Sequence, residues 1–122
     1  MKNKILLLTA LTFLLAGCGA TTNTTPPKES VIPIISNTIT YNESGFSPNS
    51  LTVKVGTTVT FTNQGTGSMW VASNPHPTHT DLPEFDEKSS AANYSFTFTK
   101  AGTWGFHNHK NPGQGGTIIV TD

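Results

Sequence analysis

Apolar and polar residues alternate through short segments in most of this 122-residue chain, beginning near residue 36. The clearest alternating pairs are Leu51 and Val53, Val59 and Phe61, Phe96 and Phe98, and Trp104 and Phe106. Successive side chains of a β-strand point to opposite faces, so a spacing of two predicts strands that each bury one face. The spacing of three and four residues that helices require is nowhere sustained. The pattern therefore predicts an all-β domain.

The residues within and between these segments support the same interpretation. Thr, Val and Ile fill the strand positions, and glycines and prolines mark the turns. We predict about seven strands, at 37–41, 51–55, 57–63, 68–73, 93–99, 103–108 and 116–121. So many short strands within residues 36–122 predict one domain folded as a β-sandwich or a small barrel.

The first residues have the pattern of a targeting segment. Lys2 and Lys4 precede an apolar run, residues 5–15, that is too short for an ordinary membrane-spanning helix. Small residues then lead to Cys18, the only cysteine of the chain. This segment resembles a bacterial lipoprotein signal, which implies removal of residues 1–17 and lipid attachment at Cys18. The alternative is an ordinary secretory signal with an incidental cysteine.

Residues 18–35 connect this signal to the predicted domain. They are rich in Thr and Pro, and we interpret them as a flexible tether. We therefore expect a protein of the cell envelope, anchored by its lipid to the outer face of the cytoplasmic membrane or to the outer membrane. After removal of the signal the chain has five lysines and seven acidic residues, which gives a formal net charge of −2. The sequence has no basic patch, so we expect no nucleic-acid binding. We also expect the domain to be monomeric.

All four histidines occur in two close pairs. His76 and His79 lie in residues 74–92, a connection longer than most in compact domains. His107 and His109 lie at the end of a predicted strand, where residues two apart project to the same side and can converge on one ion. We predict that all four histidines form one metal site.

The donors of this predicted site are imidazole and oxygen, because Cys18 lies in the leader. Among the acidic residues of the long connection, Asp81 is the best placed by sequence to coordinate the metal or to accept a hydrogen bond from a ligating imidazole. Imidazole-rich coordination suits Cu(II), Zn or Ni, and the usual order of affinity places Cu(II) first. Because metals bind neutral imidazole, affinity should decrease as the pH falls through about 6.5.

Several segments together resemble a plastocyanin-type cupredoxin. They are the segment Gly45-Phe46-Ser47-Pro48, the predicted hairpin 51–63, the run 96–106 and the closing segment 116–120. The resemblance covers nearly the whole predicted domain. It implies a Greek-key β-sandwich of two sheets with a mononuclear copper site at one end.

The usual ligands of a blue copper site are missing from the corresponding positions. In the family, the C-terminal loop supplies a Cys, a His and a Met ligand, and their positions correspond to Asn108, Asn111 and Gln114 in this chain. The position of the family's first histidine ligand lies near Met69. A blue centre requires the thiolate, so we expect none here. Asn108 and Met69 stay candidates as additional ligands or as residues that support the ligands, although a methionine beside Trp70 more often serves packing.

Strand alternation also predicts where the metal lies. Trp104 and Phe106 are expected to face the core, which turns Asn108 inward and places His107 and His109 on the opposite face unless the strand bulges. We therefore expect a type 2 copper site at the rim of the sandwich, with the long connection folded over it.

Three functions agree with these observations. The first is a lipid-anchored copper-binding protein for copper handling or electron transfer, with a redox or copper-delivery protein as its partner. The second is a small copper enzyme that acts on superoxide or another small molecule, and the third is a metal-free structural or interaction module. No Ser-His-Asp order, phosphate-binding loop or paired carboxylates stand out, so the sequence favours the non-enzymatic functions.

Overall fold

The computed structural model describes Gly17, Gly19 and residues 36–122. The unit that contains the sandwich spans Pro33–Asp122. The predicted lipidation site, nearly all of the signal peptide and most of the tether lie outside the described residues. In the part of the chain that is described, no helix is long and apolar enough to cross a membrane.

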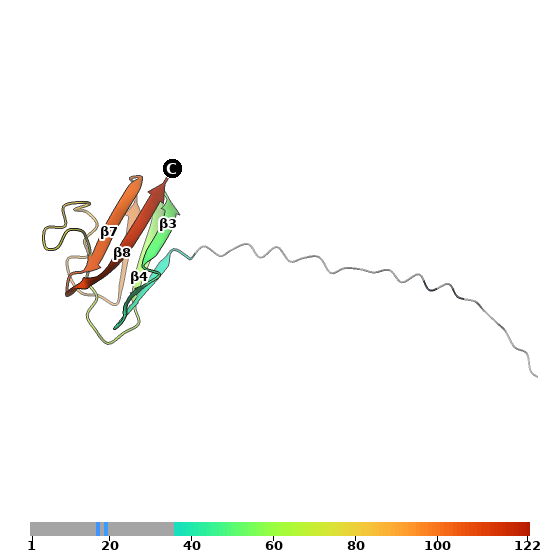
Figure 1. Ribbon diagram of the computed structural model, residues 1–122, viewed down its shortest axis with the longest axis horizontal. Helices are drawn as coiled ribbons and strands as arrows, with labels where there is room; N and C mark the ends of the chain where they lie inside the picture. The colour runs from blue at the N-terminus through green and yellow to red at the C-terminus, as the bar shows by residue number, and fades with distance from the viewer. Residues whose placement is uncertain (1–16, 18, 20–35) are drawn as a thin grey trace, which may run out of the picture. The chain divides into compact units, whose positions relative to one another are not determined.

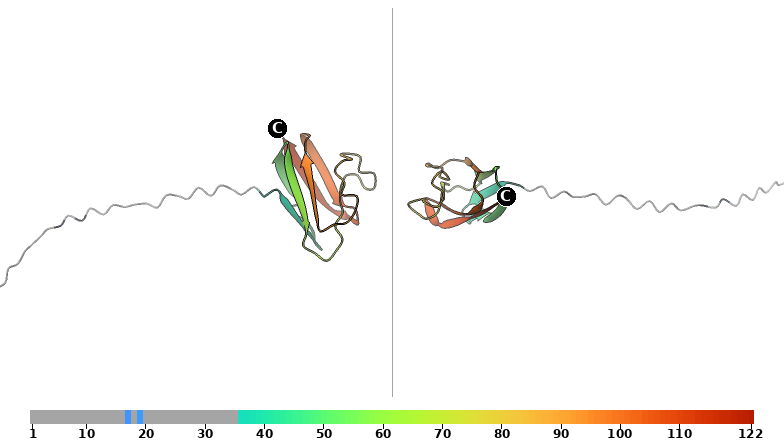
Figure 2. Two further views of the ribbon diagram at one scale, coloured as in Figure 1. Left: turned by 180° about the vertical axis from the view of Figure 1, so that it is seen from behind. Right: turned by 90° about the horizontal axis from the view of Figure 1, so that it is seen from above.

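Eight strands form two four-stranded sheets that pack against each other (Figure 1, Figure 2). One sheet has the strand order β2-β1-β4-β6 and the other has the order β3-β8-β7-β5. The strands are β1 (Thr38–Asn42), β2 (Gly45–Ser47), β3 (Ser50–Lys54), β4 (Thr57–Asn63), β5 (Val71–Ser73), β6 (Asn93–Phe98), β7 (Gly102–Asn108) and β8 (Asn111–Thr121). The predicted all-β sandwich is confirmed.

The observed strands differ from the predicted ones in detail. Gly45–Ser47 forms an additional strand that pairs antiparallel with β1. β8 begins at Asn111, five residues before the predicted start, and β5 is shorter than predicted. β2 is too short to show alternation, and the first part of β8 contains three glycines that resemble turn residues.

The predicted hairpin of residues 51–63 is wrong. β3 pairs with β8, whereas β4 pairs with β1 and β6, so the chain passes from one sheet to the other between β3 and β4. The Val55 amide donates to the Thr121 carbonyl at 2.8 Å, and the Gly56 amide donates to the Phe98 carbonyl at 2.7 Å. The turn is therefore bonded to both sheets. Residue alternation is the same in a hairpin and in such a crossover, so it does not determine which strands pair.

The connection between β5 and β6 is anchored in the core by two apolar side chains. Leu82 and Phe85 are buried, and the Phe85 ring lies 5.0 Å from the Phe98 ring and 5.8 Å from the Phe61 ring. The backbone of the connection also follows β5, because the Ser73 amide donates to the Phe85 carbonyl at 2.8 Å. These contacts hold the segment that carries the first histidine pair against the sheet.

Candidate metal centre

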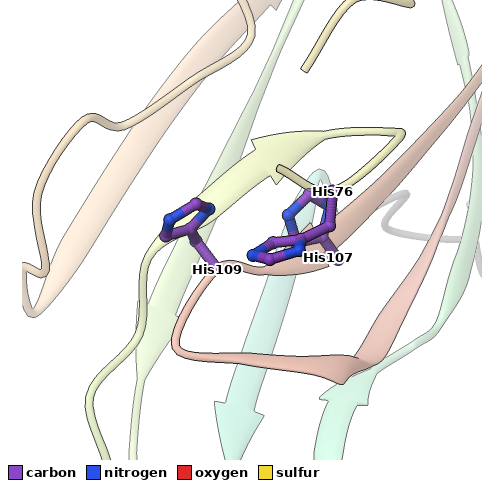
Figure 3. A group of neighbouring side chains, drawn as sticks. All are labelled: His76, His107 and His109. Atoms are coloured by element: carbon purple, nitrogen blue, oxygen red, sulfur yellow. The ribbon is translucent and has the colours of Figure 1, made fainter. Parts of the chain in front are cut away.

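The structure brings the two histidine pairs together at one end of the β3-β8-β7-β5 sheet. His107 is the second-to-last residue of β7, and His109 follows the end of that strand. His76 and His79 come from the connection after β5. The ring centroids of His76 and His109 are 4.7 Å apart, and those of His79 and His107 are 5.2 Å apart. Ring nitrogens of His76, His107 and His109 lie within 4.8 Å of one another and could hold a metal ion (Figure 3).

Asn74 covers the outer face of β7 beside His107. Gly105 leaves the necessary space, because a Cβ at that position would collide with the Asn74 side chain. The backbone N–H of Asn74 also donates to the Gly105 carbonyl at 3.0 Å. Phe106 and Asn108 are buried on the core side, and the register of β7 against β8 shifts between His107 and Asn108. The predicted arrangement, with the long connection over an outward His107, agrees with these contacts.

His107 has one ring nitrogen bonded and the other free. Its Nδ1 lies 3.1 Å from Oδ1 of Asn74, so Nδ1 carries the proton and donates it. Nε2 then has the lone pair, and this atom is buried without a hydrogen-bond partner among the described residues. Burial, followed by the charges of the neighbouring histidines, lowers the pKa of His107 to about 4. A buried unpaired acceptor costs about 1–3 kcal/mol, which a metal ion bonded to Nε2 would remove.

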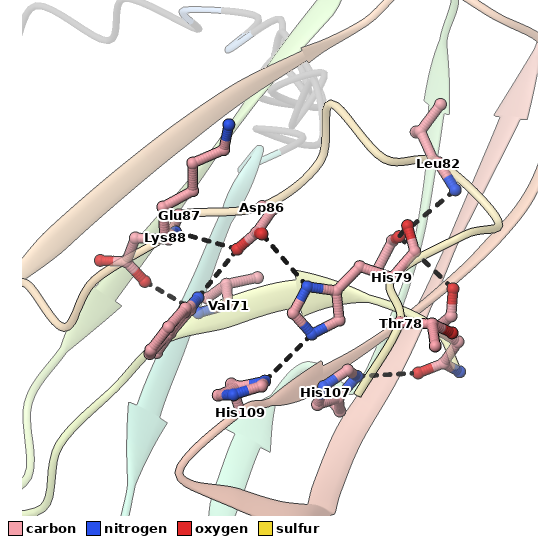
Figure 4. A network of polar contacts seen from close by, with 12 residues as sticks. Val71, Thr78, His79, Leu82, Asp86, Glu87, Lys88, His107 and His109 are labelled. Carbon is pink, nitrogen blue, oxygen red and sulfur yellow. Dashed lines mark hydrogen bonds and ion pairs between the residues drawn. The ribbon is translucent and has the colours of Figure 1, made fainter. Parts of the chain in front are cut away.

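His79 is held by an acidic residue that the sequence did not single out (Figure 4). Its Nδ1 lies 3.1 Å from Oδ2 of Asp86, and its Nε2 lies 3.0 Å from Nδ1 of His109. Asp86 Oδ1 accepts hydrogen bonds from Nε1 of Trp70 at 2.8 Å and from the Lys88 amide at 2.9 Å. Burial by itself would raise the pKa of Asp86, but these hydrogen bonds lower it below its ordinary value.

Asp81, the residue preferred from sequence, is exposed, and its amide donates to the Asn74 carbonyl at 2.9 Å. Asp86 takes the position beside His79 because its backbone pairs with Ala72 of β5. Phe85, the residue before Asp86, is fully buried in the core. The sequence does not separate these residues, because Asp81 also adjoins a buried apolar residue, Leu82, and Glu84 also adjoins Phe85.

The second histidine of the later pair packs on an aromatic ring. The His109 ring lies 4.3 Å from the Trp70 ring, and its amide donates to the Trp70 carbonyl at 2.7 Å. Lys110 lies over the Trp70 ring at 5.1 Å. Burial, followed by the charges of His79 and His76, lowers the pKa of His109. His76 is exposed and forms the open side of the cluster.

Asn108 belongs to a buried hydrogen-bond network on the core side. Its Oδ1 accepts from the amides of Trp70 at 3.0 Å and Lys110 at 3.1 Å, and its Nδ2 donates to Oη of Tyr41 at 3.0 Å. Tyr41 in turn donates to Oε1 of Gln114 at 2.9 Å. Met69 is fully buried in the hydrophobic core. These contacts give Asn108 and Met69 structural roles and disfavour them as ligands of the histidine cluster.

Comparison with known proteins identifies the family. The family model described as a cupredoxin-like domain matches residues 5–120. The chain belongs to the cupredoxin-like domain family. Membership implies copper binding or electron transfer, and the resemblance proposed from the sequence is confirmed. No match was found among the curated proteins.

Solved cupredoxins share the fold. A purple cupredoxin from Nitrosopumilus maritimus is 20% identical, with 69% of this chain and 98% of that chain covered and a TM-score of 0.58. Oxidised plastocyanin from Dryopteris crassirhizoma is 23% identical, and the match covers 69% of this chain and 99% of that chain with a TM-score of 0.56. A methionine-to-alanine mutant of amicyanin in the Cu(I) state is 28% identical, and the match covers 69% of this chain and 80% of that chain with a TM-score of 0.59.

This cupredoxin has an unusual set of donors for its fold. Residues 36–122 contain no cysteine, so the thiolate of a blue copper centre is absent from the domain. The available donors are imidazole nitrogens, of which His107 Nε2 is already deprotonated, buried and unpaired. Such a set suits a divalent ion that binds neutral imidazole.

Proposed function

We propose that this cupredoxin binds Cu(II) at its histidine cluster, without a blue centre, and serves copper handling or electron transfer. The observation that carries the proposal is the buried, unpaired Nε2 of His107 among three other imidazoles. An apoprotein used only for packing would gain stability from an apolar residue at this position, because an unpaired buried acceptor is costly. This argument favours a metal site over a metal-free structural module.

We also propose that the protein acts outside the cytoplasm, attached to a membrane through lipid on Cys18. The leader sequence supports this, as does the Thr- and Pro-rich segment between it and the domain. A redox protein or a copper-accepting protein is the partner that such a site would serve. Labelling with a radioactive fatty acid in a bacterial host tests the anchor: label should be incorporated, and the Cys18→Ala variant should lose both the label and the membrane association.

Metal analysis of the mature chain with Cys18→Ser tests the binding itself. After loading with Cu(II) and dialysis we expect one copper per chain, a type 2 EPR spectrum and no intense thiolate-to-copper absorption. The His107→Ala variant should lose most of the bound copper, whereas Glu84→Gln, a change at an exposed residue of the same connection, should retain it. Substoichiometric copper in the unmodified domain would refute the proposal.

A second function, a small copper enzyme, is favoured by one observation. His76 is exposed, so a small molecule such as superoxide has access to the ion from solvent. The copper-loaded protein would then accelerate superoxide decay, and His107→Ala would abolish that activity. Activity no greater than that of copper-free protein would exclude this function while leaving copper binding intact.

A further inference from the structure

We propose that the four histidines form a near-square arrangement around one ion, with His107 opposite His109 and His76 opposite His79. The inference rests on the proposed copper binding and concerns which oxidation state and which function the site favours. A square set of nitrogens suits Cu(II) or Ni(II), of which Cu(II) binds more tightly. We infer that the protein holds and delivers Cu(II) rather than cycling between Cu(II) and Cu(I).

The distances between rings distinguish four neighbours from two opposites. The neighbouring pairs are His76 with His109 at 4.7 Å, His79 with His109 at 4.9 Å, and His107 with each of His76 and His79 at 5.2 Å. His107 and His109 are farther apart, at 6.0 Å. In the described part of the chain, no ring contact joins His76 and His79. A tetrahedral site would make all six pairs equivalent, whereas a square has four short sides and two long diagonals.

One distance between nitrogens agrees with the side of a square. Two nitrogens at about 2.0–2.1 Å from one ion lie about 2.8–3.0 Å apart on the side of a square and about 3.3–3.4 Å apart in a tetrahedron. Nε2 of His79 and Nδ1 of His109 are 3.0 Å apart. The nitrogens of His76, His107 and His109 form one group, and His79, although adjacent to His109, falls outside it. Opposite nitrogens of such a square lie about 4.0–4.2 Å apart, so His79 has to move closer to at least one of the other histidines when an ion binds.

Two of these rings are fixed from behind by hydrogen bonds that leave Nε2 for the metal. Asn74 accepts from Nδ1 of His107, and Asp86 accepts from Nδ1 of His79. Asp86 also accepts from Nε1 of Trp70, whose ring packs on His109. One carboxylate thus positions His79 directly and His109 through Trp70. We assign Asp86 as a positioning residue of the site.

The chemistry of this arrangement separates the candidate ions. Tetragonal nitrogen coordination is typical of Cu(II) or Ni(II), whereas Zn prefers a tetrahedral set. Cu(I) is selected by thiolate and thioether ligands, and the cluster has neither. Met69, the nearest methionine in sequence to these elements, is buried in the core. The site therefore stabilises the oxidised ion, which suits a carrier or reservoir better than an electron carrier.

EPR spectroscopy of the mature Cys18→Ser chain loaded with one equivalent of Cu(II) tests the geometry. We expect an axial tetragonal spectrum with hyperfine coupling to four nitrogens. The His79→Ala variant should retain copper, couple to three nitrogens and have a higher reduction potential, because one in-plane nitrogen that stabilises Cu(II) is lost. A spectrum with strong tetrahedral distortion, or one that His79→Ala leaves unchanged, would overturn the inference while leaving copper binding established.

The positioning role of Asp86 has its own variant and control. In Asp86→Asn the side-chain oxygen stays with the N–H donors of Trp70 and Lys88, so the NH2 group faces Nδ1 of His79. This favours the His79 tautomer with the proton on Nε2, where it blocks the metal. We expect Cu(II) affinity to fall about 10–100-fold, with a changed EPR spectrum. Glu84→Gln makes the same chemical change on an exposed ion pair with Lys100 and should alter neither property. Equal affinities and spectra for the two variants would refute the role of Asp86. Failure of the unmodified protein to bind copper would instead refute the proposed function.

Discussion

Acidification should destabilise the metal-free protein through His107. Burial, aided by the neighbouring histidines, lowers the pKa of His107 to about 4 in the folded protein, against about 6.5 for an ordinary histidine. Between these two pH values the unfolded chain takes up a proton at this residue and the folded protein does not. The unfolded state therefore binds more protons, and the free energy of unfolding decreases as the pH falls. The contribution of His107 is complete above pH 6.5 and is lost progressively towards pH 4.

The magnitude follows from the two pKa values. Between pH 7 and pH 5, the linkage relation gives a loss of about 2 kcal/mol in the free energy of unfolding from this residue. Burial also lowers the pKa of His109, so this residue adds to the loss as the pH falls. The acidic groups act differently in this range. Burial raises the pKa of Glu87, so its protonation opposes the loss as the pH falls, whereas the pKa values of Asp86 and Glu43 are lowered and matter only in more acidic solution. A variant of His107 isolates its part.

Urea unfolding of the chelator-treated protein at pH 7 and pH 5 measures this effect. The unmodified chain should lose about 2 kcal/mol more than His107→Gln over the same interval, because glutamine does not titrate. NMR titration of the His107 ring protons gives an independent check and should show a midpoint well below that of an exposed histidine. Equal pH dependence in both chains, together with an ordinary midpoint, would refute the reasoning from burial.

Three further predictions concern the residues around the site. Phe85→Ala should lower the free energy of unfolding by about 3–5 kcal/mol in urea, because a fully buried ring is lost; a change below about 1 kcal/mol would show that the connection is not anchored there. Asn108→Ala should cost about 2–4 kcal/mol by leaving buried partners unpaired, yet leave the copper EPR spectrum unchanged; an altered spectrum would make Asn108 a ligand. Gly105→Ala should displace Asn74 and weaken Cu(II) binding about tenfold, whereas Gly113→Ala, where a Cβ meets only one atom at 3.7 Å, should not; equal affinities would exclude Asn74 as a support of the site.

Much of the site was predictable because its signals are local. The two histidine pairs, the long connection and the lack of cysteine in the domain are all read directly from the chain. The alternation of residues along the strand predicted that Phe106 and Asn108 face the core, and both are buried. The partner of His79 was not predictable in this way. Asp81 and Asp86 are equally acidic, and only the burial of Phe85 decides which carboxylate reaches the imidazole.

The sequence by itself determined the class of fold and the type of donor, since strand alternation and residue identity are properties of the chain alone. Only the tertiary structure decided how strands pair and how histidines face each other. β3 and β4 alternate as a hairpin would, yet they belong to different sheets because each finds its backbone partners elsewhere. Likewise, two histidine pairs can surround an ion as a tetrahedron or as a square. The choice depends on where Asn74 and Asp86 hold the rings, and those positions follow from packing between distant segments.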